Sequence, residues 1–292
     1  MQVVETVDAY RKACDAIRAG NRIGFVPTMG ALHAGHASLM RQASRAGLVP
    51  VVSIFVNPTQ FGPNEDFDRY PRTLERDLEL CASEGVQLVF TPTVAEMYPA
   101  HSRTQVRVSG LTDFMCGASR PGHFDGVATV VSKFFNATGP CSAFFGRKDY
   151  QQYRVICAMV TDLLMPVTVV GCPIWREPDG LAMSSRNRYL SPDERVRALG
   201  IIRGIADAER AFRAGERAPN VLLNRVKQSL VHSQLREGYV ALREPIELAA
   251  LEASDRLPER TLLAVAAYCG NTRLIDNLVL GEEVAPTVPG VV

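Results

Sequence analysis

Two histidines, His33 and His36, stand three residues apart in the stretch PTMGALHAGH, which begins at Pro27. The chain has only five histidines, so this pairing is unusual. An imidazole N–H can donate a hydrogen bond to phosphate oxygens and stabilise the charge that grows on them during displacement at phosphorus. Gly30 and Gly35 allow backbone to approach a ligand closely. The stretch therefore predicts a phosphate site, although a pair of metal ligands or a pair of capping or core residues remains an alternative.

Two further stretches carry side chains suited to a nucleotide. In GRKDYQQ (146–152), Lys148 would neutralise phosphate charge and Asp149 would accept hydrogen bonds from ribose hydroxyls. GLAMSSRN (180–187) holds three side chains suited to clamp a triphosphate, namely Ser184, Ser185 and Arg186. Each stretch alone is equally typical of a helix cap or a solvated ion pair. Together these stretches indicate a nucleotide site if the fold places them in one crevice.

The stretch FVNPTQFGPNEDFDRYPRT (55–73) is long, polar and rich in turn residues, which is typical of a substrate-binding loop. Gln60 in this loop and Gln152 each offer amide donors and an acceptor, and together they would hold a small molecule with hydroxyl groups and a carboxylate. A surface loop without a ligand is the alternative. Uncharged glutamines favour a hydroxy acid over a phosphorylated acceptor, which would need more arginine or lysine.

Hydrophobic periodicity predicts an α/β fold that positions these stretches. The predicted strands cover residues 22–26, 50–56, 86–90, 142–146 and 166–171. The predicted helices that alternate with them cover residues 6–19, 36–47, 73–85, 126–139 and 149–164. This alternation predicts a Rossmann-like, doubly wound parallel sheet. Ligands of such sheets bind outside the carboxyl ends of the strands, where the histidine and lysine stretches follow theirs.

The pattern changes after residue 174. Helices are predicted at 192–215 and 220–238, and three strands at 239–244, 261–268 and 274–280. We therefore expect a nucleotide- and substrate-binding domain at 1–174 and a smaller C-terminal α/β domain at 175–292 with a short antiparallel sheet, which closes over the active site.

Composition narrows the classes of partner. The chain has 292 residues with 32 basic and 31 acidic side chains, a net charge of +1, and no dense basic tract, which disfavours nucleic acid and favours small molecules. Seven scattered cysteines without a CxxC pair predict reduced thiols. We expect a cytoplasmic protein without a membrane partner, because neither a signal-peptide pattern nor an apolar run of membrane-spanning length occurs.

The chain resembles the pantothenate synthetase family in a series of motifs spread over nearly its whole length: PTMGALHAGH, FVNPTQF, YPRT, RPGHFDGVATVV, GRKDYQQ, GLAMSSRNRYL and GNTRLIDN. The resemblance implies a nucleotidyltransferase-type Rossmann domain with HIGH- and KMSKS-like elements at HAGH and MSSRN, a small C-terminal domain and a homodimer. It implies that ATP and (R)-pantoate, bound by the 1–174 domain, form an enzyme-bound pantoyl adenylate and pyrophosphate. β-Alanine then attacks the adenylate, giving pantothenate and AMP.

The resemblance also implies site residues, matched one by one. The ATP site would comprise Met29, Gly30, Ala31, Leu32, His33, Ala34, Gly35, His36, Gly146, Arg147, Lys148, Asp149, Trp175 through its backbone, Met183, Ser184, Ser185 and Arg186. The expected catalytic residues among them are His36, His33, Lys148 and Arg186. Pantoate would be bound by Gln60 and Gln152 and by an apolar wall of Pro27, Met29, Val130, Val131 and Phe145. Mg²⁺ would accompany ATP, with Asp77 as its candidate neighbour.

Two positions depart from the family pattern, because Arg147 and Arg76 stand where acidic residues are common. The alternatives to a ligase are a nucleotidyltransferase that passes AMP or CMP to a phosphorylated acceptor, an aminoacyl-tRNA synthetase and a silent nucleotide-binding regulator. The two glutamines disfavour the first and the near-zero net charge disfavours the second. The joint presence of the four expected catalytic residues disfavours the third.

Overall fold

In the computed structural model of this chain, residues 1–63 and 65–286 are described. The strands are β1 (Gln2–Val4), β2 (Ile23–Thr28), β3 (Val49–Ile54), β4 (Leu88–Phe90), β5 (Cys141–Gly146), β6 (Val167–Cys172), β7 (Arg236–Arg243), β8 (Thr261–Cys269) and β9 (Thr272–Leu280). The α-helices are α1 (Val7–Arg18), α2 (Ala34–Arg45), α3 (Leu74–Ser83), α4 (Val94–Met97), α5 (Cys116–Ser119), α6 (His123–Thr138), α7 (Tyr150–Asp162), α8 (Pro192–Ala198), α9 (Gly200–Arg213) and α10 (Pro219–His232). The 3₁₀ helices are η1 (Pro58–Gln60), η2 (Arg147–Asp149) and η3 (Ser185–Tyr189).

The chain divides into two compact units, each with its own sheet. The first unit comprises Met1–Arg147 and Gln151–Pro173, and the second comprises Lys148–Tyr150 and Ile174–Val292, of which 287–292 lie outside the described residues. The segment Lys148–Tyr150 thus belongs to the second unit although the chain on both sides of it belongs to the first.

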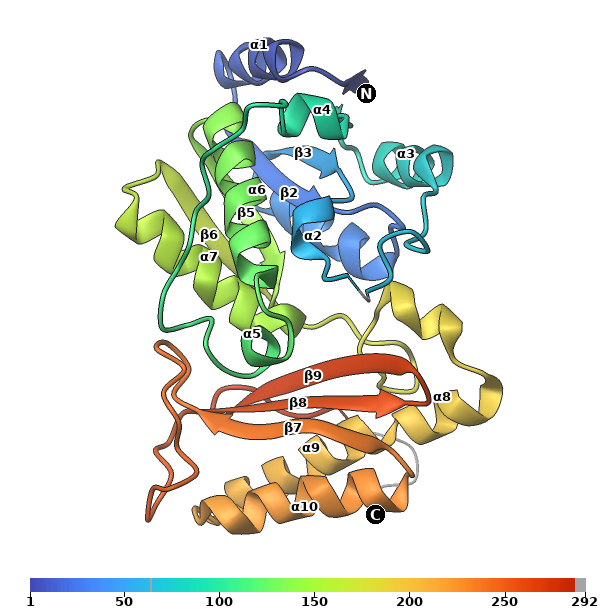
Figure 1. Cartoon of the computed structure of the whole chain (residues 1–292), viewed down its shortest axis with the longest axis vertical. Coiled ribbons are helices and arrows are strands. Elements are labelled where there is room, and N and C mark those ends of the chain that lie inside the picture. The colour runs from blue at the N-terminus through green and yellow to red at the C-terminus, as the bar shows by residue number, and fades with distance from the viewer. Residues whose placement is uncertain (64, 287–292) are drawn as a thin grey trace. The chain divides into compact units, whose positions relative to one another are not determined.

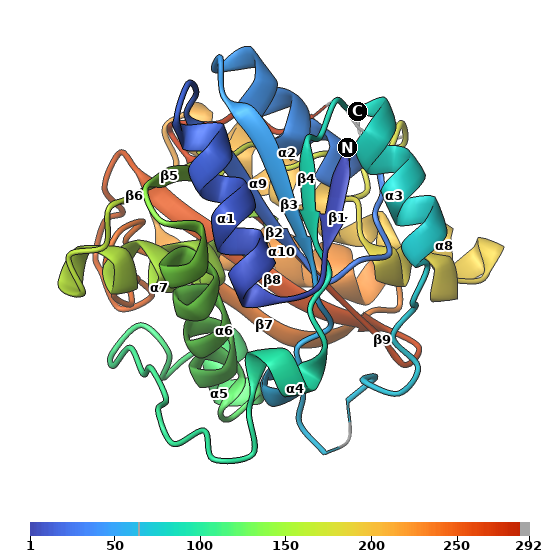
Figure 2. The same cartoon turned by 90° about the horizontal axis from the view of Figure 1, so that it is seen from above.

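A six-stranded, all-parallel sheet forms the first unit (Figure 1). Its strands lie in the order β1-β4-β3-β2-β5-β6, and Figure 2 labels all six of them. From β2 the chain adds β3 and β4 on one side, and later β5 and β6 on the other. The order therefore reverses between β2 and β5, and this reversal is where open α/β sheets place their ligands. The predicted Rossmann-like parallel sheet is confirmed.

Helices cover both faces of this sheet, with α1 and α6 on one face and α2 and α3 on the other (Figure 2). Alternation along β2 explains the arrangement, since successive side chains point to opposite faces. Phe25 meets Phe134 of α6 edge-on with ring centroids 6.0 Å apart, whereas Val26 joins the cluster around Met40 of α2. The buried sheet holds β2 rigidly, and β2 carries the loop with the two histidines.

The second unit is built on an antiparallel sheet in the order β7-β8-β9, which packs against α9 and α10. Its core contains Ile202 and Ile205 of α9, Leu222 of α10 and Leu263 of β8, all fully buried. The predicted small C-terminal domain with a short antiparallel sheet is confirmed.

Two predicted element boundaries in the second unit were wrong. The helix expected to reach Gly238 ends at His232, because Gln234 adopts a positive φ of 55° and β7 begins at Arg236. Gly238 is no helix cap but lies at a β-bulge, where an added Cβ would be 3.0 Å from the Ala266 carbonyl oxygen. The glycine that suggested a helix end therefore lies inside a strand.

The single helix predicted at 192–215 is two helices, α8 and α9, with the break at Leu199. Gly200 then begins α9 in close contact with α10, since an added Cβ would lie 2.2 Å from Ser233 Oγ. Ser229 Oγ donates to the Gly200 carbonyl at 2.8 Å and fixes this contact. The short edge strand β1, paired with β4, was not predicted because so short a strand carries too little periodicity.

Candidate active site

The loop between β2 and α2 lies at the carboxyl edge of the parallel sheet, beside the reversal of strand order. It contains two consecutive residues with positive φ, Gly30 at 77° and Ala31 at 49°. Thr28 stabilises the turn, as its Oγ1 accepts from Gly30 N at 3.2 Å and donates to the Ser53 carbonyl at 2.7 Å. This turn directs the chain into α2 and places the N-terminus of that helix, whose dipole favours anions, at the sheet edge.

His33 and His36 cap the N-terminus of α2 with their side chains. Nδ1 of His33 accepts from Gly35 N at 3.1 Å, and Nδ1 of His36 accepts from His33 N at 3.3 Å, so the two form a reciprocal capping box. Their rings lie against each other, with centroids 4.0 Å apart. A ring nitrogen that accepts a hydrogen bond carries no proton, so in the neutral rings the proton is on Nε2. The cap therefore places the proton of both neutral rings on Nε2, so the observed capping role is compatible with the predicted phosphate role.

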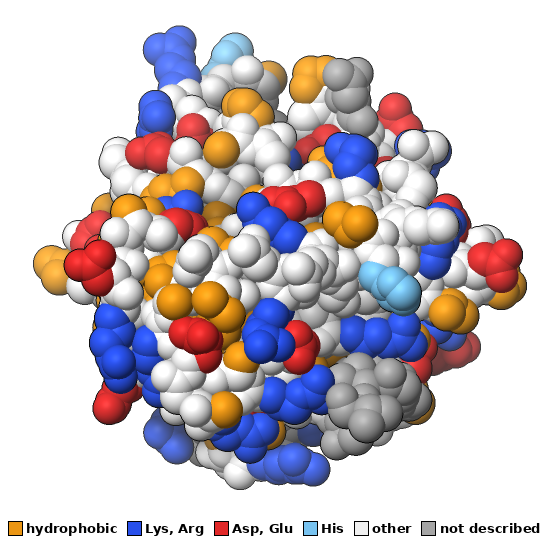
Figure 3. Space-filling view, turned by 90° about the horizontal axis from the view of Figure 1, so that it is seen from below, with side chains coloured by type: hydrophobic (Ala, Val, Ile, Leu, Met, Phe, Trp, Pro, Cys, Tyr) orange, Lys and Arg blue, Asp and Glu red, His pale blue; other side chains and the backbone are white. Residues whose placement is uncertain are grey.

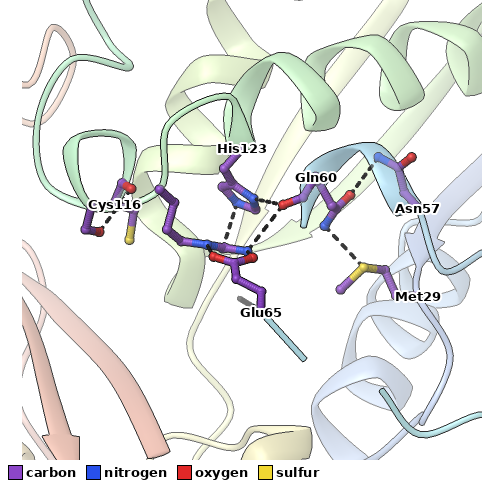
Figure 4. Close-up of polar contacts among 8 residues, drawn as sticks. Met29, Asn57, Gln60, Glu65, Cys116 and His123 are labelled. Carbon is purple, nitrogen blue, oxygen red and sulfur yellow. Dashed lines mark hydrogen bonds and ion pairs between the residues drawn. The ribbon is translucent and has the colours of Figure 1, made fainter. Parts of the chain in front are cut away.

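The side chain of Gln60 is held in a defined orientation by Asn57 and Met29 (Figure 4). Asn57 Nδ2 donates to Gln60 Oε1 at 3.0 Å and to the Gly126 carbonyl at 3.1 Å. Gln60 Nε2 donates to Met29 Sδ at 3.1 Å. Asn57 is 1% exposed and Gln60 8% exposed, so both amides are fixed within the protein. Two predicted residues of the site, Met29 and Gln60, are thus in direct contact.

The backbone of Gln60 is fixed by an ion-pair network from the RPGHFDG stretch, shown in Figure 4. His123 Nδ1 lies 2.8 Å from the Gln60 carbonyl oxygen, and Arg120 Nη1 lies 3.0 Å from His123 Nε2. Arg120 also donates twice to the Glu65 carboxylate, from Nε at 2.6 Å and from Nη2 at 2.5 Å. Burial alone would raise the pKa of the Glu65 carboxyl, but the hydrogen bonds and charge of Arg120 outweigh burial and lower that pKa.

Helix α6 approaches the Gln60 loop so closely that only glycine fits at the contact. A Cβ added to Gly126 would lie 2.5 Å from the Thr59 carbonyl oxygen and 2.7 Å from Gln60 N. Real Cβ atoms do not approach backbone so closely, because such distances are far inside van der Waals contact. The position of η1, and with it Gln60, is therefore set by the backbone of α6.

The adjacent glutamines of α7 have different surroundings. Gln151 is buried and binds the 111–116 segment, accepting from Cys116 N at 2.9 Å and donating to the Leu111 carbonyl at 2.9 Å. Gln152 is only partly buried. The first glutamine thus has a structural role, and substrate binding by the second stays a prediction. The predicted apolar wall comprises Pro27, Met29, Val130, Val131 and Phe145. The last three are buried, whereas Pro27 and Met29 are partly buried.

In the second unit, Lys148 is held by its backbone and lies near one carboxylate. Asn277 Nδ2 of β9 donates to the Lys148 carbonyl at 2.8 Å. Lys148 Nζ is 3.7 Å from Asp149 Oδ2, a long ion pair, and the lysine side chain is 19% exposed. The sheet of the second unit thus positions the backbone that carries this ammonium group, and the long pair neutralises its charge only weakly.

A hairpin in the second unit carries the predicted residues Trp175 and Met183, joined by a hydrogen bond from Met183 N to the Trp175 carbonyl at 2.9 Å. Arg176 in this hairpin forms a double hydrogen bond with Asp276 of β9, at 2.6 Å and 2.9 Å. The Ser184–Arg186 segment that follows begins η3, where Ser184 Oγ accepts from Arg186 N at 3.2 Å. Adjacent residues of β9 therefore hold both the hairpin and Lys148.

Several residues of these networks were not singled out in the sequence. Asn57, Arg120 and His123 fix Gln60, and Asp276 and Asn277 fix the second-unit loops. All five lie within the motifs FVNPTQF, RPGHFDGVATVV and GNTRLIDN. A polar side chain next to a glycine was the available signal for His123, and a polar side chain inside an apolar strand was the signal for Asp276 and Asn277, since such residues are buried only with partners.

The sequence matches one enzyme family over almost its whole length. Residues 2–279 match the profile of the family described as Pantoate-beta-alanine ligase. The chain is 51% identical over 285 residues to the pantothenate synthetase of Geotalea daltonii, covering 97% of this chain and 100% of that protein. It is 52% identical over 285 residues to the pantothenate synthetase of Geobacter sulfurreducens, with the same coverage of 97% and 100%.

Solved structures show the same relationship. The pantothenate synthetase from Thermus thermophilus has a TM-score of 0.89 at 44% identity, covering 96% of this chain and 99% of that one. A pantoate-beta-alanine ligase from Francisella tularensis, complexed with beta-gamma ATP and beta-alanine, has a TM-score of 0.77 at 32% identity, covering 97% and 99%. The similarity therefore extends through both units of the fold.

Proposed function

Because the chain belongs to the pantoate-beta-alanine ligase family, we propose how its own residues divide the work of that family's reaction. The enzyme joins (R)-pantoate to β-alanine in an ATP-dependent reaction. The pantoate carboxylate attacks the α-phosphorus of ATP and displaces pyrophosphate. The amine nitrogen of β-alanine then attacks the acyl carbon of the pantoyl adenylate, loses a proton and displaces AMP.

The histidine capping box is the observation that supports our assignment of the first step. The attack on phosphorus increases negative charge on the phosphate oxygens, and preorganised donors that meet this charge lower the barrier. Nε2–H of His33 and of His36 are such donors, because each Nδ1 is engaged by the cap. Lys148 and Arg186 add positive charge to the triphosphate. The other ATP-binding residues proposed are Met29–Leu32, Ala34, Gly35, Gly146, Arg147, Asp149, Trp175 and Met183–Ser185.

We assign pantoate binding to Gln60 and Gln152, with Met29 in the apolar wall against its methyl groups. An amide can donate to a carboxylate and accept from a hydroxyl, both of which pantoate carries. The contacts of Gln60 with Asn57 and Met29 preorganise its amide, which reduces the entropy lost on binding.

Replacing Gln60 with alanine is expected to raise the KM for pantoate at least tenfold while changing kcat less. The reason is the loss of the hydrogen bonds between the Gln60 amide and pantoate, and a tenfold loss of affinity corresponds to about 1.4 kcal/mol of binding free energy. Steady-state kinetics with pantoate as the varied substrate measure the effect, and the exposed Gln105→Ala is the matched control. An unchanged pantoate KM would remove Gln60 from the binding site.

Mg²⁺ is proposed to arrive with ATP, bound mainly by phosphate oxygens and water. The ligand set supports this division, because residues 1–63 and 65–286 contain no group of three His, Cys, Asp or Glu side chains arranged for a metal. When bound, the ion would neutralise charge on the phosphates. Asp77, its predicted neighbour, does not fit as a ligand because its carboxylate is already bound by three protein donors.

The remaining proposals concern partners and location. We propose small-molecule partners, a homodimer and a cytoplasmic location. Basic and acidic side chains both occur on the face shown in Figure 3, with apolar side chains between them, in keeping with a net charge of +1. In the described residues the seven cysteines form no disulfide, which supports the proposal of a reducing compartment. None of the helices in the described part of the chain has the length and apolar character needed to cross a membrane.

Pyrophosphate release is the test of this function, measured with ATP, Mg²⁺ and pantoate, with and without β-alanine. We expect pyrophosphate to depend on pantoate in both cases, and pantothenate to appear by mass spectrometry only when β-alanine is added. This pattern establishes the order of the two steps. The absence of pantoate-dependent pyrophosphate release would instead show that the chain acts on another acid or another acceptor.

A further inference from the structure

We propose that Asp77 is a positioning residue that sets the conformation of the phosphate-binding loop, and not a ligand of the metal. Asp77 lies in the first turn of α3 and is 1% exposed. Its Oδ2 accepts from Ala31 N at 2.9 Å, and its Oδ1 accepts from Leu32 N at 2.8 Å. One carboxylate thus binds two consecutive backbone N–H groups of a loop 45 residues away in the sequence.

The loop adopts a backbone conformation that needs this support. Ala31 has a φ of 49°, in the left-handed region that residues with a Cβ rarely adopt. Gly30 precedes it with a φ of 77°, and a Cβ there would lie 3.0 Å from Asp77 Oδ2. The chain therefore wraps around the carboxylate, and hydrogen bonds to a charged acceptor compensate for the unfavourable φ of Ala31.

The position of the two histidines follows from this contact. Leu32, whose N–H is bound by Asp77, directly precedes His33, the N-cap of α2. The capping box then fixes His36 relative to His33. Small errors in the position of such donors cost much of their effect on the transition state. Asp77 thus acts on the reaction through the loop, without touching the substrate.

A metal role is a poor fit to the same contacts. Thr73 Oγ1 donates to Asp77 Oδ1 at 3.1 Å, so three protein donors bind the two carboxylate oxygens. A carboxylate in a Mg²⁺ site instead faces an ion that keeps most of its water.

Asp77→Asn tests the proposal with little change in size. One carboxylate oxygen becomes an NH₂ group, which faces a backbone N–H and cannot accept from it. We expect kcat for pantoate-dependent pyrophosphate release to fall about tenfold, with the KM for ATP and the half-saturating Mg²⁺ concentration changed less than about twofold. Glu79→Gln removes one negative charge from an exposed position of the same helix and is the control. Thr73→Val, which removes one donor to Asp77, should give a smaller loss in the same direction.

Amide hydrogen exchange gives a second readout that needs neither substrate nor metal. In the ligand-free Asp77→Asn protein, exchange at Ala31 and Leu32 should accelerate about tenfold or more, with the core strand β3 unchanged. The catalytic readout rests on the proposed function, whereas exchange does not, so the two can fail separately.

Three outcomes would overturn the proposal. Unchanged exchange at Ala31 and Leu32 would show that Asp77 does not hold the loop. Recovery of the wild-type rate at high Mg²⁺ would identify Asp77 as a metal ligand. Faster unfolding or a lower Tm with unchanged kcat would reduce Asp77 to a purely structural residue.

Discussion

Replacing His36 with alanine is expected to slow pantoate-dependent pyrophosphate release at least a hundredfold. The substitution removes an Nε2–H donor held at the N-terminus of α2, and a hundredfold corresponds to about 2.7 kcal/mol of activation free energy. Loss of one preorganised donor in other enzymes has an effect of this size. Pre-steady-state measurement of the first turnover separates this step from attack by β-alanine.

His36 also caps a helix, so its two roles must be separated experimentally. His36→Gln keeps an acceptor at the third helical position, where glutamine completes a capping box, and should restore the Tm lost in the alanine variant. We expect it to leave the rate far below that of the wild type, because the imidazole is absent. The exposed His101→Ala is the control for removal of a histidine. A rate within about threefold of the wild type for His36→Ala would exclude His36 from the mechanism.

Lys148→Ala is the second substitution expected to reduce pyrophosphate release at least a hundredfold. Its ammonium group forms a long ion pair with Asp149, at 3.7 Å, and so retains charge for the triphosphate. Charge–charge stabilisation of a phosphoryl-type transition state is largest when the cation is poorly neutralised by the protein. The fold should be unaffected, because Asn277 binds the backbone carbonyl of residue 148 and not its side chain.

The second unit offers a closely matched control for this prediction. Lys227 Nζ of α10 lies 3.7 Å from Glu237 Oε1 of β7, the same distance as in the Lys148 pair, and the two side chains are 44% and 40% exposed. Lys227→Ala should therefore leave the rate unchanged. Lys148→Arg keeps the charge but replaces a compact ammonium with a planar group, and an intermediate rate is expected. Equal rates for Lys148→Ala and Lys227→Ala would show that Lys148 does not contact the reacting phosphates.

The sequence predicted most accurately those features that local rules determine. The strand-to-helix turn at Gly30 and the pairing of His33 with His36 were readable because strand, glycine and helix follow one another directly along the chain. The parallel sheet followed from the alternation of elements, and its prediction needed no knowledge of individual contacts. The helix expected up to Gly238 was wrong because a glycine at a bulge and a glycine at a helix end look alike in sequence.

Contacts between distant parts of the chain were the part that could not be predicted. The resemblance implied Asp77 as a neighbour of Mg²⁺, whereas its contacts with Ala31 and Leu32 depend on the packing of α3 beside the loop. Asn57 and His123 likewise act on Gln60 through contacts that the fold creates. A single sequence specifies residue types and spacing, but which buried polar groups meet depends on tertiary structure.

The contact of Gly126 with the Thr59 carbonyl also has a consequence for sequence variation. Since a Cβ would lie 2.5 Å from that oxygen, any larger residue at 126 must be accompanied by a change in the 57–60 segment. Residue 126 and the 57–60 segment should therefore covary in evolution, although they are far apart in the sequence. A relative that carries a larger residue at 126 together with an altered 57–60 segment would mark a ligase whose acid substrate has changed.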